Sequence, residues 1–272
     1  SGGIDSSSIV SSLVSDFKIT DLNTFSAIYK DDDPNDESEY IFEYKNIIKN
    51  LFTTFPTADS LYNEFEDLIE VHTEPFPGVG NYIQYKVMEA AHGKVKVTLN
   101  GQGADELISG YHNFFSIYYI ELIKNFKIYK LLREIYFYIK KHGLKNLIQN
   151  LKYFIFYLLP VFLQNSINKR RYSSINKKFF EDYKSNEVNK LLYKPKDLNE
   201  SMVQHVKHKL EHMLRWDDLH SMAFSIESRV PFLDFRLVEA VLKTPSNQKI
   251  NDGETKHLLR QSLKDILPKK II

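Results

Sequence analysis

The sequence predicts an α/β fold in which a parallel sheet carries helices on both faces and a helical lobe is attached. Along residues 1–113, segments with helical periodicity alternate with short apolar segments that are typical of buried strands. Two polar, glycine-rich loops at 1–7 and 101–111 lie where ligands bind in such sheets. From 114 to about 201, glycine is rare, aromatic residues and lysines are frequent, and the periodicity is helical. The alternation of helical and apolar segments predicts the sheet. The change to a helical sequence rich in aromatic residues and lysines predicts the attached lobe.

The first expected elements follow the opening loop SGGIDSS at 1–7. Five apolar residues then share one face of an expected helix: Ile9, Val10, Leu13, Val14 and Phe17. The segment NTFSAIY at 23–29 predicts a buried strand. A polar loop at 31–40 leads into EYIFEYKNIIKNLF at 39–52, for which we expect a second helix.

The alternation continues up to the second glycine loop. We expect helices at 60–72 and 81–92, separated by the loop EPFPGVG at 74–80, which prolines and glycines break. The segment KVKVTLN at 94–100 is expected to be a strand, and GQGADELISGY at 101–111 follows it directly. Because ligands bind at the carboxyl ends of parallel strands, the second loop is a candidate part of a site.

Composition restricts the chemistry. The 272 residues include no cysteine, which excludes disulfides, thiolate metal sites and a cysteine nucleophile within this sequence. This composition fits a reducing compartment, and we expect a cytoplasmic protein. The longest apolar run, YFIFYLLPVFL at 153–163, is too short to span a bilayer and contains Pro160, so no membrane span is expected.

Charge is distributed unevenly although the net charge is +1. Residues 1–113 contain 7 Lys/Arg and 19 Asp/Glu, a balance of −12, whereas residues 114–200 contain 17 and 7, a balance of +10. Such runs are more often solvated helical faces than polyanion sites, so we expect no nucleic-acid partner. Polyanion binding by 114–200 is the alternative, and it predicts an affinity that falls steeply with salt. Residues 202–272 are expected to be helical, with a polar break at 244–254.

The opening loop has the properties of a phosphate cradle. Glycines let the backbone approach a ligand, and a helix directly afterwards adds a partial positive charge. The loop lacks the Gly-Lys-Ser/Thr ending of a Walker A motif. Asp5 would repel a phosphate unless it holds Mg²⁺, which neutralises both groups. The structural alternative is a glycine-rich turn with serine N-caps.

Four stretches carry a resemblance to a known family. SGGIDSS resembles the pyrophosphate loop of the N-type ATP pyrophosphatases, and LNGQGADELISGY at 99–111 resembles a segment of asparagine synthetases within that superfamily. LRWDDLHSMAFSIESRVPFLD at 214–234 and KHLLRQSLKDILP at 256–268 are similar to two further motifs of that family. The resemblance implies an adenine nucleotide alpha hydrolase-like fold, with 1–272 as an ATP-pyrophosphatase domain and 114–200 as a basic aromatic helical insertion.

The resemblance also implies what lies outside the sequence. In the family a buried strand precedes the pyrophosphate loop, and a catalytic lysine follows the closing helix. We therefore expect the chain to be a fragment of a longer protein, with a strand before Ser1 and a lysine after Ile272. A fragment of this kind is expected to bind ATP weakly and to form no asparagine alone.

The family's site residues carry over onto matching positions. ATP is expected to contact the first loop, the end of one strand and the second loop through Ser1, Gly2, Gly3, Asp5, Ser6, Ser7, Ala27, Asn100 and Gly101. Asp5 and Asp105 are expected to hold Mg²⁺, with Asp105 counted as catalytic; a helix N-cap is its structural alternative. Arg215 is expected to act on the phosphates or on the developing charge, or else to be a surface arginine over Trp216.

The activity that the resemblance implies is ATP-dependent amide formation. The side-chain carboxylate of aspartate becomes an acyl-AMP with release of pyrophosphate, and ammonia from glutamine displaces AMP. A glutaminase domain is expected upstream, and a homodimer is left open. The alternatives are a ligase of the same fold that acts on another acid, of the beta-lactam or peptide-cyclase type, and a non-catalytic scaffold. Gln102 disfavours the beta-lactam type because glutamine cannot act as a general base.

Two further sets of polar residues receive structural interpretations. Glu227 and Arg229 are expected to form a structural ion pair that shapes the site where a helix end turns into Pro231, with a role in substrate binding as the alternative. His205, His208 and His212 are expected to share one helix face without binding metal, because none of them is followed directly by glutamate as in the zinc motif H-E-x-x-H.

Overall fold

The computed structural model describes most of the chain, namely residues 2–29, 33, 36–169, 176, 178–179, 182, 191–192 and 194–272. The described chain forms two compact units. The first contains 1–103, 211–234 and 260–272, and the second contains 104–210 and 235–259. Ser1 and part of the predicted lobe at 114–200 lie outside the described residues.

The first unit contains a parallel pair of strands, β1 (Asn23–Ala27) and β2 (Asn50–Thr54), paired from Asn23 with Asn50 to Ala27 with Thr54. The strand predicted at 23–29 is confirmed. The helix predicted at 39–52 is wrong beyond its first turns, because α2 (Ser38–Ile41) and the 3₁₀ helix η1 (Phe42–Tyr44) end before β2 begins. Hydrogen bonds to β1 and the stacking of Phe52 on Phe25, 5.2 Å between ring centroids, outweigh the local helical period there.

A second parallel pair joins β3 (Val97–Leu99) to β4 (Glu227–Arg229). The sequence predicts β3 but not β4, since three residues are too few to show alternation. Backbone bonds from Glu227 N to Lys96 O at 2.9 Å and from Asn100 N to Arg229 O at 3.0 Å extend the ladder. The predicted parallel strands are present, but in the described residues they form two separate pairs, and the predicted sheet that joins them is not shown. Periodicity identifies strands, but tertiary pairing selects their neighbours.

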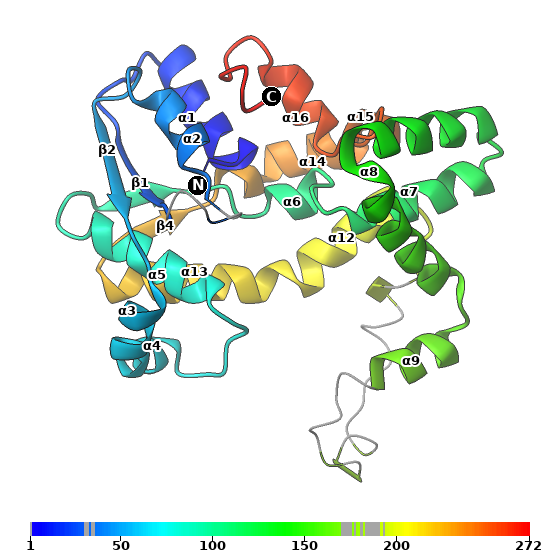
Figure 1. The fold of residues 1–272 in the computed structure, drawn as a ribbon, viewed down its shortest axis with the longest axis horizontal. Coiled ribbons are helices and arrows are strands. Elements are labelled where there is room, and N and C mark those ends of the chain that lie inside the picture. The colour runs from blue at the N-terminus through cyan, green and yellow to red at the C-terminus, as the bar shows by residue number, and fades with distance from the viewer. Residues whose placement is uncertain are drawn as a thin grey trace. The chain divides into compact units, whose positions relative to one another are not determined.

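Helices surround these pairs in the first unit (Figure 1). They are α1 (Ile4–Ser15), α3 (Ala58–Asn63), α4 (Phe65–His72), α5 (Gly80–Ala91), α13 (Leu210–Ala223) and the 3₁₀ helix η3 (Pro231–Leu233). α5 packs against both β1 and β2. The helix predicted at 60–72 is divided, because Glu64 leaves helical geometry at φ −105° and ψ 12°. The last helix, α16 (His257–Leu263), spans the boundary between the two units.

The second unit is helical in its described part, as the sequence predicts. It contains α6 (Ala104–Leu107), α7 (Asn113–Lys124), α8 (Ile128–Leu158), α9 (Val161–Lys169), α12 (Leu198–His208), α14 (Phe235–Lys243) and α15 (Ser246–Lys249). Four aromatic side chains of α7 are almost fully buried: Phe114, Phe115, Tyr118 and Tyr119. α8 kinks at Gly143, whose φ of 80° is left-handed.

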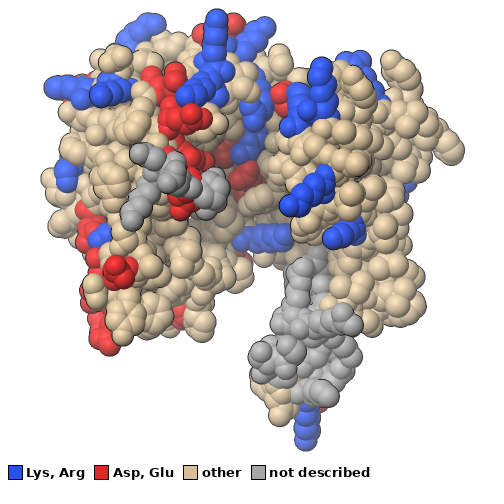
Figure 2. All heavy atoms as spheres, in the orientation of Figure 1, with Lys and Arg blue, Asp and Glu red and all other residues tan. Residues whose placement is uncertain are grey.

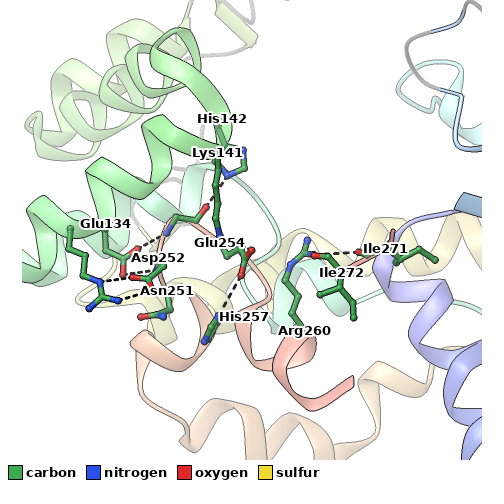
Figure 3. Close-up of polar contacts among 12 residues, drawn as sticks. Glu134, Lys141, His142, Asn251, Asp252, Glu254, His257, Arg260, Ile271 and Ile272 are labelled. Atoms are coloured by element: carbon green, nitrogen blue, oxygen red, sulfur yellow. Dashed lines mark hydrogen bonds and ion pairs between the residues drawn. The ribbon is translucent and has the colours of Figure 1, made fainter. Parts of the chain in front are cut away.

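The polar break predicted at 244–254 ends in a turn that packs on α8 (Figure 3). The buried Glu134 carboxylate accepts backbone N–H bonds from Asp252 at 3.1 Å and Gly253 at 3.0 Å. An ion pair from Lys141 to Glu254 at 2.7 Å lies beside it. Gly253 has φ 69°, and a Cβ there would lie 2.5 Å from the backbone nitrogen of Tyr138. Only glycine therefore fits at this contact.

The uneven charge of the sequence is visible on the surface. On the face shown in Figure 2, acidic side chains concentrate over the first unit, including the region of α3 and α4 at its lower edge. Among the charged side chains that the second unit shows on that face, lysines and arginines predominate. None of the helices in the described ranges combines the length and apolar character needed to cross a membrane.

Candidate active site

The first glycine loop leads directly into α1. Gly3 is the N-cap residue in an extended conformation, and a glycine has no side chain to accept the first N–H groups of the helix. The Gly2 N–H donates to Glu37 Oε2 at 2.8 Å. A Cβ on Gly2 would lie 2.7 Å from the Cβ of Tyr40, so only glycine fits. The start of α1 is thus a helix N-terminus that suits an anion, with Asp5 in its first turn.

Ser6, Ser7 and Ser8 make hydrogen bonds at the start of α1. Ser6 Oγ donates to the Gly3 carbonyl at 3.2 Å, and Ser8 Oγ donates to the Asp5 carbonyl at 2.6 Å. Ser7 is buried, and its carbonyl accepts from Tyr44 Oη at 3.1 Å. These bonds hold the loop in one conformation, and the predicted phosphate contacts of its serines remain predictions.

The second glycine loop contacts the first within the same unit. A Cβ on Gly101 would lie 2.7 Å from the Cβ of Asp5 and 3.2 Å from the backbone nitrogen of Ser6. Gly103 has φ 88°, and a Cβ there would clash with the Leu233 side chain. The structure therefore brings together Asp5, Ser6 and Gly101, three residues that the sequence assigns to one site.

Asn100 lies between β3 and this loop, and both ends of its side-chain amide have hydrogen-bond partners inside the protein. Its Nδ2 donates to Asp217 Oδ2 and to Ser228 Oγ, both at 2.8 Å. Its Oδ1 accepts from the Gln102 N–H at 3.0 Å. Both amide hydrogens are thus used, and a nucleotide contact predicted for Asn100 is left to its oxygens and main chain.

Asp217 is a buried carboxylate that the sequence analysis does not single out. It is 3% exposed, and it accepts from Gln84 Nε2, Asn100 Nδ2 and Ser228 Oγ. Burial raises the pKa of the Asp217 carboxyl, and these three donors oppose that rise. In the sequence it stands beside Asp218 inside the third motif, and of the two only Asp218 is exposed.

Two further predicted residues lie elsewhere in the first unit. Ala27 ends β1 beside Thr54 at the end of β2, so it occupies the carboxyl end of a parallel pair, where nucleotides bind in α/β folds. Arg215, on α13, forms an ion pair with Glu74 at 3.3 Å. Glu74 belongs to the loop at 74–80, whose sequence predicts only a break between two helices. A guanidinium has five N–H donors, so it can bind this carboxylate and an anionic ligand together.

Glu227 and Arg229 form the predicted ion pair, with 2.9 Å between Arg229 NH2 and Glu227 Oε1. The pair lies on β4 rather than at a helix end, which corrects the predicted context. Both side chains are more than half exposed, so the contact contributes little to stability.

Asp105 belongs to the second unit and is paired with a cation there. α6 begins at Ala104, so Asp105 lies in its first turn rather than at its N-cap. Its Oδ1 is 2.6 Å from Nζ of Lys256, a lysine of the closing motif that the sequence analysis does not assign. The neighbouring Glu106 is buried and accepts from Tyr111 Oη, and burial raises its pKa. The roles of Asp105 in metal binding and catalysis remain predictions.

The three histidines do not share one helix. His205 and His208 lie on α12, which ends there, and His212 lies on α13. His205 is buried, and its Nδ1 donates to the Ser201 carbonyl at 2.8 Å. Within the described ranges, no group of three or more His, Cys, Asp or Glu side chains is arranged to hold a metal ion.

A glycine loop that opens a helix, beside parallel strands and a second glycine loop, is typical of α/β domains that bind a nucleotide. Comparison with known families identifies the domain further. The asparagine synthase family model matches residues 1–272, and the chain belongs to that family.

Three relatives agree with this assignment. Asparagine synthetase [glutamine-hydrolyzing] 1 of Bacillus subtilis is 28% identical over 295 residues, covering 100% of this chain and 44% of the relative. A protein of Methanocaldococcus jannaschii with the same kind of name is 32% identical over 143 residues, which are 50% of this chain and 26% of that protein. Asparagine synthetase [glutamine-hydrolyzing] 3 of Bacillus subtilis is 43% identical over 63 residues, 23% of this chain and 10% of the relative. The chain thus spans less than half the length of each.

Proposed function

We propose that this domain is the synthetase part of a glutamine-dependent asparagine synthetase. The observation that carries the proposal is the contact of the two glycine loops, in which Gly101 lies against Asp5 at the start of α1. Family membership over 1–272 supports the same activity. The proposed reaction joins aspartate and ammonia at the expense of ATP, which is cleaved to AMP and pyrophosphate.

The chemistry divides into two displacements. A side-chain carboxylate oxygen of aspartate attacks the α-phosphorus of ATP, the bond to the β-phosphate oxygen breaks, and pyrophosphate leaves. Ammonia then attacks the acyl carbon, the bond to AMP breaks, and the nitrogen loses a proton. The N-terminus of α1 and the N–H groups of the first loop would bind the leaving pyrophosphate, and Arg215 would stabilise the charge that develops.

The donor set at the loops fits the magnesium complex of ATP. Carboxylates are the protein ligands that Mg²⁺ takes, and Asp5 supplies one beside the proposed phosphate site. We propose Asp105 as the second ligand on the strength of its motif, with Lys256 orienting its carboxylate. Bound Mg²⁺ would neutralise phosphate oxygens and so allow a carboxylate in an anion site.

The remaining parts of the proposal concern the complete protein. We propose that nitrogen reaches this domain as ammonia from a glutaminase domain of the same protein, that the enzyme works in the cytoplasm, and that it forms a homodimer. The names of the relatives, which specify glutamine hydrolysis, support the nitrogen source.

Exchange of labelled pyrophosphate into ATP in the complete protein tests the proposal. Aspartate should support exchange, and Asp5→Asn should reduce it by about 100-fold or more, because an anion site loses its metal ligand. Asp16→Asn, at the exposed C-terminal end of the same helix, is the matched control and should keep the wild-type rate. Exchange with another acid but not with aspartate would assign a different amide ligase, and no exchange with any acid would indicate a scaffold.

A further inference from the structure

The polar cluster around Asp217 connects four elements of the first unit. Gln84 comes from α5, Asn100 from the end of β3, Asp217 from α13 and Ser228 from β4. All the donors to Asp217 are neutral side chains, so a buried carboxylate is held here by hydrogen bonds to uncharged groups. Burying such a carboxylate costs free energy, which its hydrogen bonds must offset.

The two oxygens of the carboxylate bind different partners. Oδ1 accepts from Gln84, whereas Oδ2 accepts from Asn100 at 2.8 Å and from Ser228 at 2.5 Å. Because Oδ2 takes an Nδ2 hydrogen of Asn100, the amide must direct Oδ1 the other way. That oxygen then accepts the backbone N–H of Gln102 at 3.0 Å. A chain of bonds therefore runs from Asp217 through Asn100 to the second glycine loop.

The loop at the end of this chain has little freedom. Gly101 lies against Asp5, and Gly103 lies against Leu233 with a left-handed φ of 88°. Gln102, between them, has its N–H fixed by Asn100. The orientation of the Asn100 amide therefore determines the position of the Gly101 backbone relative to the first loop.

We infer that Asp217 is a positioning residue for the ATP site, which acts by orienting Asn100 so that the loop Gly101–Gly103 is held against Asp5. The inference deepens the proposed function and rests on it for the identity of the ligand. Asn100 and Asp217 thus form a hydrogen-bonded pair, and the amide oxygen of Asn100 holds the loop.

Gln84 provides the matched control, because it binds the same carboxylate at the other oxygen. Asp217→Ala removes the acceptor of Asn100, whereas Gln84→Ala removes one bond of Asp217 and leaves Asn100 in place. Asp217→Asn is the conservative variant, since its remaining oxygen can accept from Asn100 and Ser228 while Gln84 turns its own oxygen to the new amide.

Hydrogen exchange of the Gln102 amide in the complete protein is the primary measurement. Asp217→Ala should speed this exchange about tenfold or more, because a hydrogen bond of the buried network is lost. Gln84→Ala and Asp217→Asn should leave it near the wild-type rate. Asn100→Ala should speed it as much as Asp217→Ala, and the double variant should add nothing further, because the two residues act in series.

ATP–pyrophosphate exchange kinetics supply the functional arm. Asp217→Ala should raise the KM for ATP about tenfold with a smaller change in kcat, and Asp217→Asn should restore the wild-type KM. The inference is overturned if Gln102 exchanges at the wild-type rate in Asp217→Ala, or if Gln84→Ala accelerates it equally. If Asp217→Ala does not fold, a wild-type exchange rate in Asn100→Ala overturns it. Absence of pyrophosphate exchange in the wild type would refute the proposed function and leave the hydrogen-exchange result to decide the positioning role.

Discussion

The two units each hold a turn in place with a buried carboxylate, but they do so differently. In the second unit, Glu134 accepts two backbone N–H groups of the turn directly. In the first unit, Asp217 binds only side chains, and one of them, Asn100, holds the loop. A direct backbone bond makes the turn part of the folded core. In the first unit the loop is held through two side chains, so its position depends on which residues stand at positions 100 and 217. This dependence suits a binding site more than a structural turn.

The largest effect is expected from removing the direct bond. Glu134→Ala should destabilise the second unit by about 2–4 kcal/mol, because a buried and a partly buried backbone amide lose their acceptor. Urea denaturation and hydrogen exchange at residues 251–254 measure it. Glu239→Ala, an exposed glutamate on α14, is the control and should change little. If Asp217→Ala proved equally destabilising, the contrast between the two units would be wrong.

A fall in pH should affect buried histidines in both units. Burial lowers the pKa of His220 in the first unit and of His205 in the second to about 4. The unfolded chain, with a pKa near 6.5, then binds more protons between pH 6.5 and 4, so stability falls as pH falls through this window. Each of these histidines lowers the free energy of unfolding by about 3 kcal/mol once the pH is below about 4.

Thermal unfolding across pH 4–7 measures this dependence. His220→Gln and His205→Gln should each remove about one proton from the uptake on unfolding. His212→Gln, at an exposed position, is the control. The His220 site carries an additional feature, a bond of 2.7 Å between Nε2 of His220 and Nε2 of His72. An unchanged pH slope in either buried variant would contradict the prediction.

Two left-handed glycines permit a smaller test. Gly253 in the second unit has φ 69° and faces the backbone of α8, whereas Gly93 in the first has φ 72° with open space around its Cα. Gly93→Ala should cost about 1 kcal/mol from backbone strain alone, and Gly253→Ala about 2–3 kcal/mol because a steric clash is added. Denaturation midpoints compare them, and equal losses would show that the turn at 251–254 can move away from α8.

The smallest effects are expected at exposed ion pairs, which should not distinguish the units. Lys49 pairs with Asp21 at 3.2 Å in the first unit, and Lys243 pairs with Glu239 at 3.2 Å in the second. Lys49→Ala and Lys243→Ala should each change stability by about 0.5 kcal/mol or less, because solvent screens both pairs. Calorimetry at low and high salt checks this, and a loss of several degrees in either variant would refute it.

Local patterns predicted the elements that carry their own signal. The helix after the first loop, the strand at 23–29 and the helix at 81–92 appear close to their predicted places as α1, β1 and α5. The helix predicted at 39–52 was wrong at its C-terminal end. The apolar residues there have helical spacing, but residues 50–54 pair with β1 as a strand. β4 was not predicted, because three residues are too few to show an alternating pattern.

The candidate site was predictable to the extent that motifs mark it. Both glycine loops, Asp5 and Arg215 come from such motifs, and Gly101 lies against Asp5 as a shared site requires. Asp217, Glu74 and Lys256 were missed as site neighbours, since their partners Asn100, Arg215 and Asp105 are far away in the chain. Only folding brings these pairs together.

The sequence by itself determined the family, the alternation of helices and strands in the first unit, and the positions of the two glycine-rich loops. These properties depend on neighbouring residues and on short motifs, whose physical consequences are local. The tertiary structure decided which strands pair, and it decided that Asn100 faces Asp217 instead of standing free at the loop. Hydrogen bonds between residues more than a hundred positions apart depend on how the chain packs, because no local preference encodes the distance between them.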